Sequence, residues 1–278
     1  MGTLLLLNFG TFAETNKYKA QALSSGFLPS DAMQDNPPGA LLVPDGVREV
    51  RQVAGVDVVS FHGLTPKVWR GKLDTGTDYA AAFEAWIGKV VSKPVSCVYL
   101  TGHHWDDHKS ARLSVLSWGD TTAHFHARFD RAANRLWFGI DRKLLAVDTA
   151  KLTSTCRLVL GFGCNVGTPI NSSKYQTFFG NPPPVVLGWD ASVSVPRAKG
   201  PSVNERFFEY LDDFARTSGK VPQSDRLEWF YLNEPMELVK AWGHATAKWL
   251  SSRARARDQA GELWRFKVTK GVVQPKKV

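Results

Sequence analysis

The sequence predicts an α/β protein, a three-layer α/β/α sandwich with a mostly parallel central sheet. Three observations support this fold class. Two apolar runs, Val95–Leu100 and Leu158–Phe162, have the length of buried strands and end close to glycine. A helical pattern over 78–91 separates the first run from an earlier predicted strand over 55–64. Strand, helix and strand in succession form the unit that builds a parallel sheet.

Length and composition are those of a globular protein. The chain has 278 residues, of which 43% are hydrophobic, and a formal net charge of +9. The apolar start lacks a basic leader, and no run approaches a membrane-spanning length, so we expect a cytoplasmic protein with no membrane contact. Three cysteines give no disulfide framework, and a reducing compartment would keep a reactive thiol usable.

The first part of the chain, residues 1–54, is expected to be an amino-terminal extension over the main sheet. It carries the turn signals Asn36–Gly39 and Pro44–Gly46, and one strand is predicted over 4–12.

The main domain is expected to span residues 55–250. After the strand that ends at Thr101, a polar stretch precedes two partly alternating segments that predict a hairpin. A buried strand and two amphipathic helices follow the Cys164 region. In chain order these later elements cover 123–129, 135–140, 185–189, 204–215 and 236–250.

The last part of the chain, residues 251–278, is expected to be a basic tail. Its cationic residues include Arg253, Arg255, Arg257, Lys267, Lys270, Lys276 and Lys277. Such a tail can bind nucleic acid or an acidic partner. No nucleic-acid-binding motif is found among these residues, so we expect a solvated tail and no nucleic acid partner.

Reactive and polar residues follow several predicted strands at their carboxyl ends. They are His62, His103, Cys164 and the pair Trp189–Asp190. In open α/β sheets, ligands bind beyond these ends. We therefore expect the strands before His103 and Cys164 to be neighbours, with the two residues facing each other.

Cysteine and histidine in this position suit nucleophilic catalysis. A cysteine attacks a carbonyl only as its thiolate, and histidine is a suitable base because its pKa lies near neutrality. The backbone N–H groups of His104 and Cys164 would stabilise the oxyanion. Cys97 and Cys156 lie inside apolar runs and are expected to be buried thiols. The plain alternative is that Cys164 is also a buried thiol and His103 a polar loop residue.

An apolar run followed by Gly102-His103, and a later one followed by Gly163-Cys164, resembles the caspase-like cysteine peptidases, including the CHAT-type proteases of bacteria. The resemblance covers about residues 55–215 and rests on the order and spacing of the two motifs. His104 stands where the family usually has glycine, and Gly163 where it usually has alanine.

The resemblance implies a cysteine endopeptidase that cleaves proteins or peptides with a His103–Cys164 dyad and without a metal or cofactor. It also implies an activating partner and a role in bacterial defence or programmed cell death. Asp190 and Trp189 would line the first substrate pocket, where a carboxylate favours Lys or Arg. The residues alone leave Asp190 equally open as a solvated turn residue, and Trp189 as a core residue.

The main alternative is a metal-dependent hydrolase. The stretch His103-His-Trp-Asp-Asp-His108 is dense in metal ligands and resembles the metallo-β-lactamase motif His-x-His-x-Asp-His, with Trp105 in place of the second histidine. Gly161 to Gly167 lacks the spacing of a dinucleotide-binding loop, and no helix is predicted after it. A catalytically inactive caspase-like scaffold that binds a partner is the non-enzymatic alternative.

Overall fold

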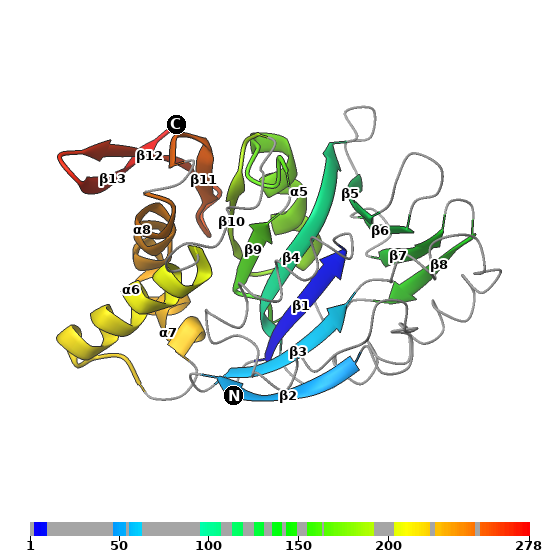
Figure 1. The fold of residues 1–278 in the computed structure, drawn as a ribbon, viewed down its shortest axis with the longest axis horizontal. Coiled ribbons are helices and arrows are strands. Elements are labelled where there is room, and N and C mark those ends of the chain that lie inside the picture. Colours follow the sequence, from blue (N-terminus) through cyan, green and yellow to red (C-terminus); the bar gives the residue numbers. More distant parts are fainter. Residues whose placement is uncertain are drawn as a thin grey trace, which may run out of the picture.

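The computed structural model describes residues 3–9, 47–53, 56–62, 95–106, 113–118, 125–130, 135–140, 143–148, 155–162, 164–191, 203–222, 226–247 and 251–278. Within these residues the protein has a mixed β-sheet with helices packed on it (Figure 1). The α/β class predicted from the sequence is confirmed. The helix predicted over 78–91 lies outside the described residues.

Parallel strands form the centre of the described sheet. Their order across the sheet is β3 (Val56–His62), β1 (Thr3–Phe9), β4 (Val95–Asp106), β9 (Leu158–Phe162) and β10 (Val185–Trp189). Strand β2 (Val47–Val53) runs antiparallel to β3. The strands predicted over 55–64, 95–101, 158–162 and 185–189 are all present.

Strands β1 and β2 lie within the segment expected to be an extension over the sheet. Instead, β1 pairs with β3 on one side and with β4 on the other, so that Leu5 lies opposite both Val59 and Val98. A continuous apolar run such as Leu4–Leu7 is typical of a central parallel strand. This part of residues 1–54 therefore belongs to the sheet.

Strand β4 continues beyond the parallel sheet into an antiparallel ribbon. Its last residues, His103–Asp106, pair with β5 (Leu113–Trp118). Strands β6 (Phe125–Asp130), β7 (Arg135–Ile140) and β8 (Lys143–Asp148) extend the ribbon (Figure 1). The hairpin predicted from 123–129 and 135–140 is confirmed as β6–β7. Strand β5 lies in a stretch for which only polarity was expected.

The carboxyl-terminal segment is not the solvated tail that its charge suggested. After a short 3-10 helix, η2 (Ser251–Arg253), it forms β11 (Ala254–Arg257), β12 (Leu263–Thr269) and β13 (Val272–Lys277). These strands extend the sheet antiparallel from β10. In β11 the two alanines are buried and the two arginines are only partly buried, which is the alternation of a strand with one covered face.

Helices α6 (Val203–Ser218), α7 (Arg226–Asn233) and α8 (Pro235–Thr246) pack together near β10 and β11 (Figure 1). Helices α6 and α8 confirm the predictions over 204–215 and 236–250, whereas α7 was not predicted. Alternate residues of β9 and β10 share one core with these helices. It includes Leu158, Leu160, Val185, Leu187, Trp189, Phe207, Leu211, Leu227, Phe230, Leu238 and Trp242.

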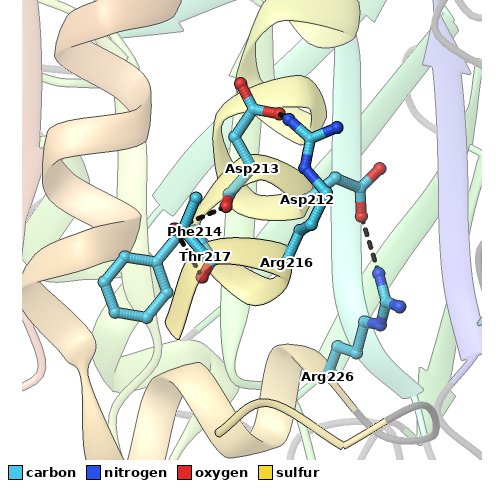
Figure 2. Close-up of polar contacts among 6 residues, drawn as sticks. All are labelled: Asp212, Asp213, Phe214, Arg216, Thr217 and Arg226. Atoms are coloured by element: carbon cyan, nitrogen blue, oxygen red, sulfur yellow. Dashed lines mark hydrogen bonds and ion pairs between the residues drawn. The ribbon is translucent and has the colours of Figure 1, made fainter. Parts of the chain in front are cut away.

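An ion pair joins α6 to α7. The Nη1 atom of Arg226 donates a hydrogen bond to Oδ1 of Asp212 at 2.7 Å (Figure 2). A second pair, between Arg216 and Asp213, lies within α6 and is more exposed, because 77% and 68% of the two side chains face solvent. The Asp212–Arg226 pair therefore has the better position to fix the packing of two helices.

Helix α5 (Pro169–Phe179) follows β9 and packs against β10, β5 and β6. Its buried rings, Tyr175, Phe178 and Phe179, do not belong to the core of α6–α8. Neither do Val159 and Val186, which alternate with the core residues of β9 and β10 and are also buried. Since side chains alternate across a strand, α5 covers the opposite face of β9 and β10. This helix corrects the expectation that none follows Gly167.

No helix in the described part of the chain is long and apolar enough to cross a membrane.

Candidate functional site

The strands that lead to His103 and Cys164 are parallel neighbours, as predicted. Strands β4 and β9 pair from Cys97 opposite Leu158 to Thr101 opposite Phe162. His103 and Cys164 each stand two positions after the last of these pairs. His103 lies within β4 just beyond its pairing with β9, and Cys164 lies in the turn that follows β9, so the backbone brings both residues to the same end of this strand pair.

The turn that contains Cys164 is bonded to the end of β10. The N–H of Asn165 donates to the carbonyl oxygen of Ala191 at 3.2 Å, and the N–H of Gly167 donates to that of Trp189 at 2.8 Å. Asn165 has a φ of 62°, in the left-handed region that asparagine tolerates better than most residues. These two bonds fix the backbone that directly follows the thiol.

Glycines let this turn fold down onto the two strands. A Cβ atom at Gly161 in β9 would overlap the side chain of Val166, which is buried below the turn. A Cβ atom at Gly188 in β10 would lie 2.8 Å from the backbone nitrogen of Gly167. The close backbone approach explains why the apolar strand sequences are interrupted by glycine at these positions.

The first turn of α5 supports the same segment. Thr168 is the N-cap, and its Oγ1 accepts a hydrogen bond from the N–H of Asn171 at 3.2 Å. The side chain of Asn171 is buried, and its Nδ2 donates to the carbonyl oxygen of Asn165 at 2.9 Å. Pro169 stands in the first turn, where its missing N–H removes no helical hydrogen bond.

The three cysteines differ in their surroundings. Cys97 and Cys156 are fully buried, as predicted, whereas Cys164 has intermediate exposure. Burial raises the pKa of Cys97 well above its ordinary value, and the nearby Cys156 adds to this rise. Burial also raises the pKa of Cys156 to about 12, against smaller opposite effects that include its hydrogen bond to Leu158. Of the three cysteines, Cys164 is the one that is not buried.

Asp190 and Trp189 lie at the end of β10, as expected, but both have partners within the chain. The carboxylate of Asp190 forms an ion pair with Arg255, and Arg253 lies 4.0 Å from it. A substrate lysine or arginine would compete with Arg255 for this carboxylate. The ring of Trp189 is fully buried and meets the ring of Trp242 edge-on, with centroids 4.7 Å apart. Of the two roles left open for Trp189, the structure supports the core role.

The histidine-rich stretch falls mostly within a regular strand. His103, His104, Trp105 and Asp106 lie opposite Ser117, Leu116, Val115 and Ser114 of β5. Asp107 and His108 are outside the described residues. The described residues contain no group of three or more His, Cys, Asp or Glu side chains that could hold a metal ion. The predicted oxyanion donor His104 has its backbone in this ribbon. His62 is the last residue of β3.

Three supporting residues were missed in the sequence: Asn171, Arg255 and Val166. Asn171 and Val166 hold the turn of Cys164, and Arg255 pairs with Asp190. The consecutive Thr168 and Pro169 are a signal for a helix start that would have placed Asn171 in a first turn. Comparisons of the chain with family models, with curated proteins and with solved structures found no match.

Proposed function

We propose that this protein is a cysteine endopeptidase that uses Cys164 as nucleophile and His103 as base. The pairing of β4 and β9 supports this proposal, because His103 follows the paired part of β4 and Cys164 follows β9 at the same end of two neighbouring parallel strands. Ligands of such sheets bind beyond these ends. A three-layer, caspase-like architecture is part of the proposal, supported by α5 and α6–α8 on opposite faces of β9 and β10.

Each step of the reaction has a candidate group. His103 removes the thiol proton, and the sulfur of Cys164 adds to the carbonyl carbon of the scissile peptide. The N–H groups of Cys164 and His104 stabilise the oxyanion. His103 then gives its proton to the leaving amine, which leaves a thioester on Cys164. A water molecule, deprotonated by His103, hydrolyses this thioester and restores the thiol.

The support around the thiol favours a functional role over that of a packing residue. Cys97 and Cys156 are fully buried, as expected of cysteines whose role is packing. Cys164 is more exposed and sits in a turn bonded to β10 and α5. A fixed backbone at the nucleophile is a requirement for efficient attack. We place the activity in the cytoplasm, where a thiol stays reduced.

We assign no preference for Lys or Arg before the cleaved bond, because Asp190 is already paired with Arg255. The substrate class of the proposal is protein or peptide. An activating partner and a role in bacterial defence or cell death remain part of the proposal through the family resemblance.

The deciding experiment is cleavage of a diverse peptide library, read by mass spectrometry. Wild type is compared with Cys164→Ala and His103→Ala, and Cys156→Ser is the matched control because a serine can keep the hydrogen bond to Leu158. Cleavage by wild type and Cys156→Ser, and its loss in the other two variants, supports the dyad. Cleavage that persists in Cys164→Ala excludes this nucleophile.

A thiol probe and a metal assay separate the rival functions. Rapid alkylation of Cys164 by iodoacetamide that slows in His103→Ala is the result expected of a dyad. Slow alkylation of Cys164 at the same rate in wild type and His103→Ala, together with no peptide cleavage, favours a binding scaffold. Stoichiometric zinc in the purified protein, lost in His103→Ala, favours the metal hydrolase.

A further inference from the structure

Positively charged residues lie directly opposite one another across the carboxyl-terminal strands. Arg255 of β11 is paired in register with Arg265 of β12, and Arg265 is paired with Lys276 of β13. Lys267 stands two positions after Arg265 on the same strand. We call Arg265, Lys267 and Lys276 the basic face, since alternate residues of a strand, and those paired with them, share one side of a sheet.

The other side of these strands is partly covered, at Phe266 and Val273, and the basic face is open. Phe266 is buried and packs beside Gly243 of α8, and Val273 contacts the same glycine. Arg265, Lys267 and Lys276 are all exposed. Helix α8 therefore packs against the apolar side of the β12–β13 hairpin, and the basic face is exposed to solvent.

The cations of the basic face have no anionic partner within the described residues. Two carboxylates beside these strands already have cationic partners, since Asp190 pairs with Arg255 and Glu262 pairs with Lys277 at 2.6 Å. No ion pair involves Arg265, Lys267 or Lys276 in the part of the chain that the structure describes. The charge of Arg265 also adds to the effect of burial in lowering the pKa of Arg255.

This arrangement is unfavourable for the isolated protein. Like charges directly opposite each other in a sheet destabilise the pairing. Residues 263–278 contain five Lys and Arg residues and no Asp or Glu, so the hairpin contains no carboxylate side chain to relieve the repulsion. An anionic partner would relieve the repulsion between these cations. The same charges that oppose folding would then strengthen the binding of that partner.

We propose that the basic face of β12–β13 docks an acidic segment of a protein partner, a stretch rich in Asp and Glu. Charge complementarity indicates an anionic partner. The composition of the face favours a polypeptide over a single-stranded nucleic acid. The residues that alternate with Trp264 and Phe266 include no aromatic ring on which bases could stack.

The test is the anisotropy of a fluorescein-labelled oligoglutamate peptide added to the full chain in the Cys164→Ala background, so that no cleavage interferes. The double variant R265E/K276E reverses two charges of the basic face. R216E/K220E is the matched control, since it reverses two exposed charges at the end of α6. R265Q/K276Q removes the charges without reversing them and serves if the first variant does not fold.

The peptide is expected to bind the parent protein, more weakly as salt increases. Binding should weaken by about tenfold or more in R265E/K276E and remain within about twofold in R216E/K220E. No binding to the parent, or an equal loss in both variants, would overturn the proposal. So would an oligothymidylate of equal charge that binds more tightly than the peptide and depends on the same residues, because the occupant would then be a nucleic acid.

Discussion

The side chain of Asn171 donates a hydrogen bond over 2.9 Å to the carbonyl oxygen of Asn165, the residue that follows Cys164. Helix α5 thus holds the turn of the candidate nucleophile from its own first turn. Asn165 accepts a second bond from the N–H of Thr168 at 3.2 Å. The turn has a backbone support and a side-chain support, and the second can be removed without touching the thiol.

Replacing Asn171 with alanine should lower the free energy of unfolding by about 1 kcal/mol, because one partly buried hydrogen bond is lost while the bond from Thr168 stays. We also expect slower Cys164-dependent peptide cleavage, since the turn is less well fixed. Thr177→Ala in the same helix is the control, because its hydroxyl bonds only within the helix, to Ser173. Equal behaviour of the two variants would show that Asn171 does not support the site.

Gly161→Ala should destabilise the protein by about 1–3 kcal/mol, as overpacking does in a filled core. The new methyl group would overlap the side chain of Val166. The second change Val166→Ala should recover part of that loss, because it removes the atoms that clash. Val166→Ala should not rescue Gly188→Ala, whose nearest obstacle is the backbone nitrogen of Gly167 at 2.8 Å. Denaturant unfolding of both double-mutant cycles measures the difference.

Stability should fall in alkaline solution because of Cys156. Its thiol ionises at 9.0 in the unfolded chain, whereas burial raises the pKa to about 12 in the folded protein. The stabilisation from the protonated thiol is fully present below pH 9.0 and is lost as pH rises to about 12, because the unfolded state releases its proton first. Cys156→Ser should flatten the decline in the free energy of unfolding over this range. Identical slopes for the two proteins would contradict the assignment.

Arg265→Glu should raise the melting temperature. The new carboxylate would lie opposite both Arg255 and Lys276, so that two repulsive pairs become attractive. The gain for exposed cross-strand pairs is about 0.2–1 kcal/mol each. Lys267→Glu is the comparison, since Lys267 lies opposite the uncharged Gln274 and should change stability less. A lower melting temperature for Arg265→Glu would mean that the row of cations carries no repulsion.

The ion pair between Asp212 and Arg226 should show a larger coupling energy than the pair between Asp213 and Arg216. Arg226 is 25% exposed and joins two helices, whereas both members of the second pair are mostly exposed and lie on one helix. Double-mutant cycles with asparagine and glutamine replacements should give about 0.5–1 kcal/mol for the first pair and less for the second. The difference between the two coupling energies should become smaller at high salt concentration.

The periodic spacing of apolar residues was sufficient to predict the strands and helices whose buried side is apolar. The neighbouring strands β4 and β9 followed from Val95–Leu100 and Leu158–Phe162, and α6 from its spaced phenylalanines. Helix α5 escaped prediction because much of what it buries is polar. Asn171, Ser172, Lys174 and Gln176 are buried there beside the rings of Tyr175, Phe178 and Phe179, so the sequence of the helix shows no distinct apolar side.

Charge misled the prediction for the end of the chain. The residues 254–257 alternate Ala and Arg, and the arginines suggested a solvated tail. The alanines are the informative residues, because their small side chains let β11 pack under α8. Arg257 is also bonded to Ser172 and Pro169 of α5. Neither contact follows from sequence spacing, since the partners are far apart in the chain.

Strand β4 pairs with β1 and β9 before His103 and with β5 from His103 onward. His103 and Cys164 therefore depend on different supports, the antiparallel ribbon for one and β10 with α5 for the other. Local opening of a protein proceeds in cooperative units with separate free energies. Hydrogen exchange should thus show the backbone at His103 opening together with β5, while the amides of Asn165 and Gly167 keep the protection of β10. We therefore expect the two halves of the proposed dyad to belong to different cooperative units, so that either can open locally while the other stays closed.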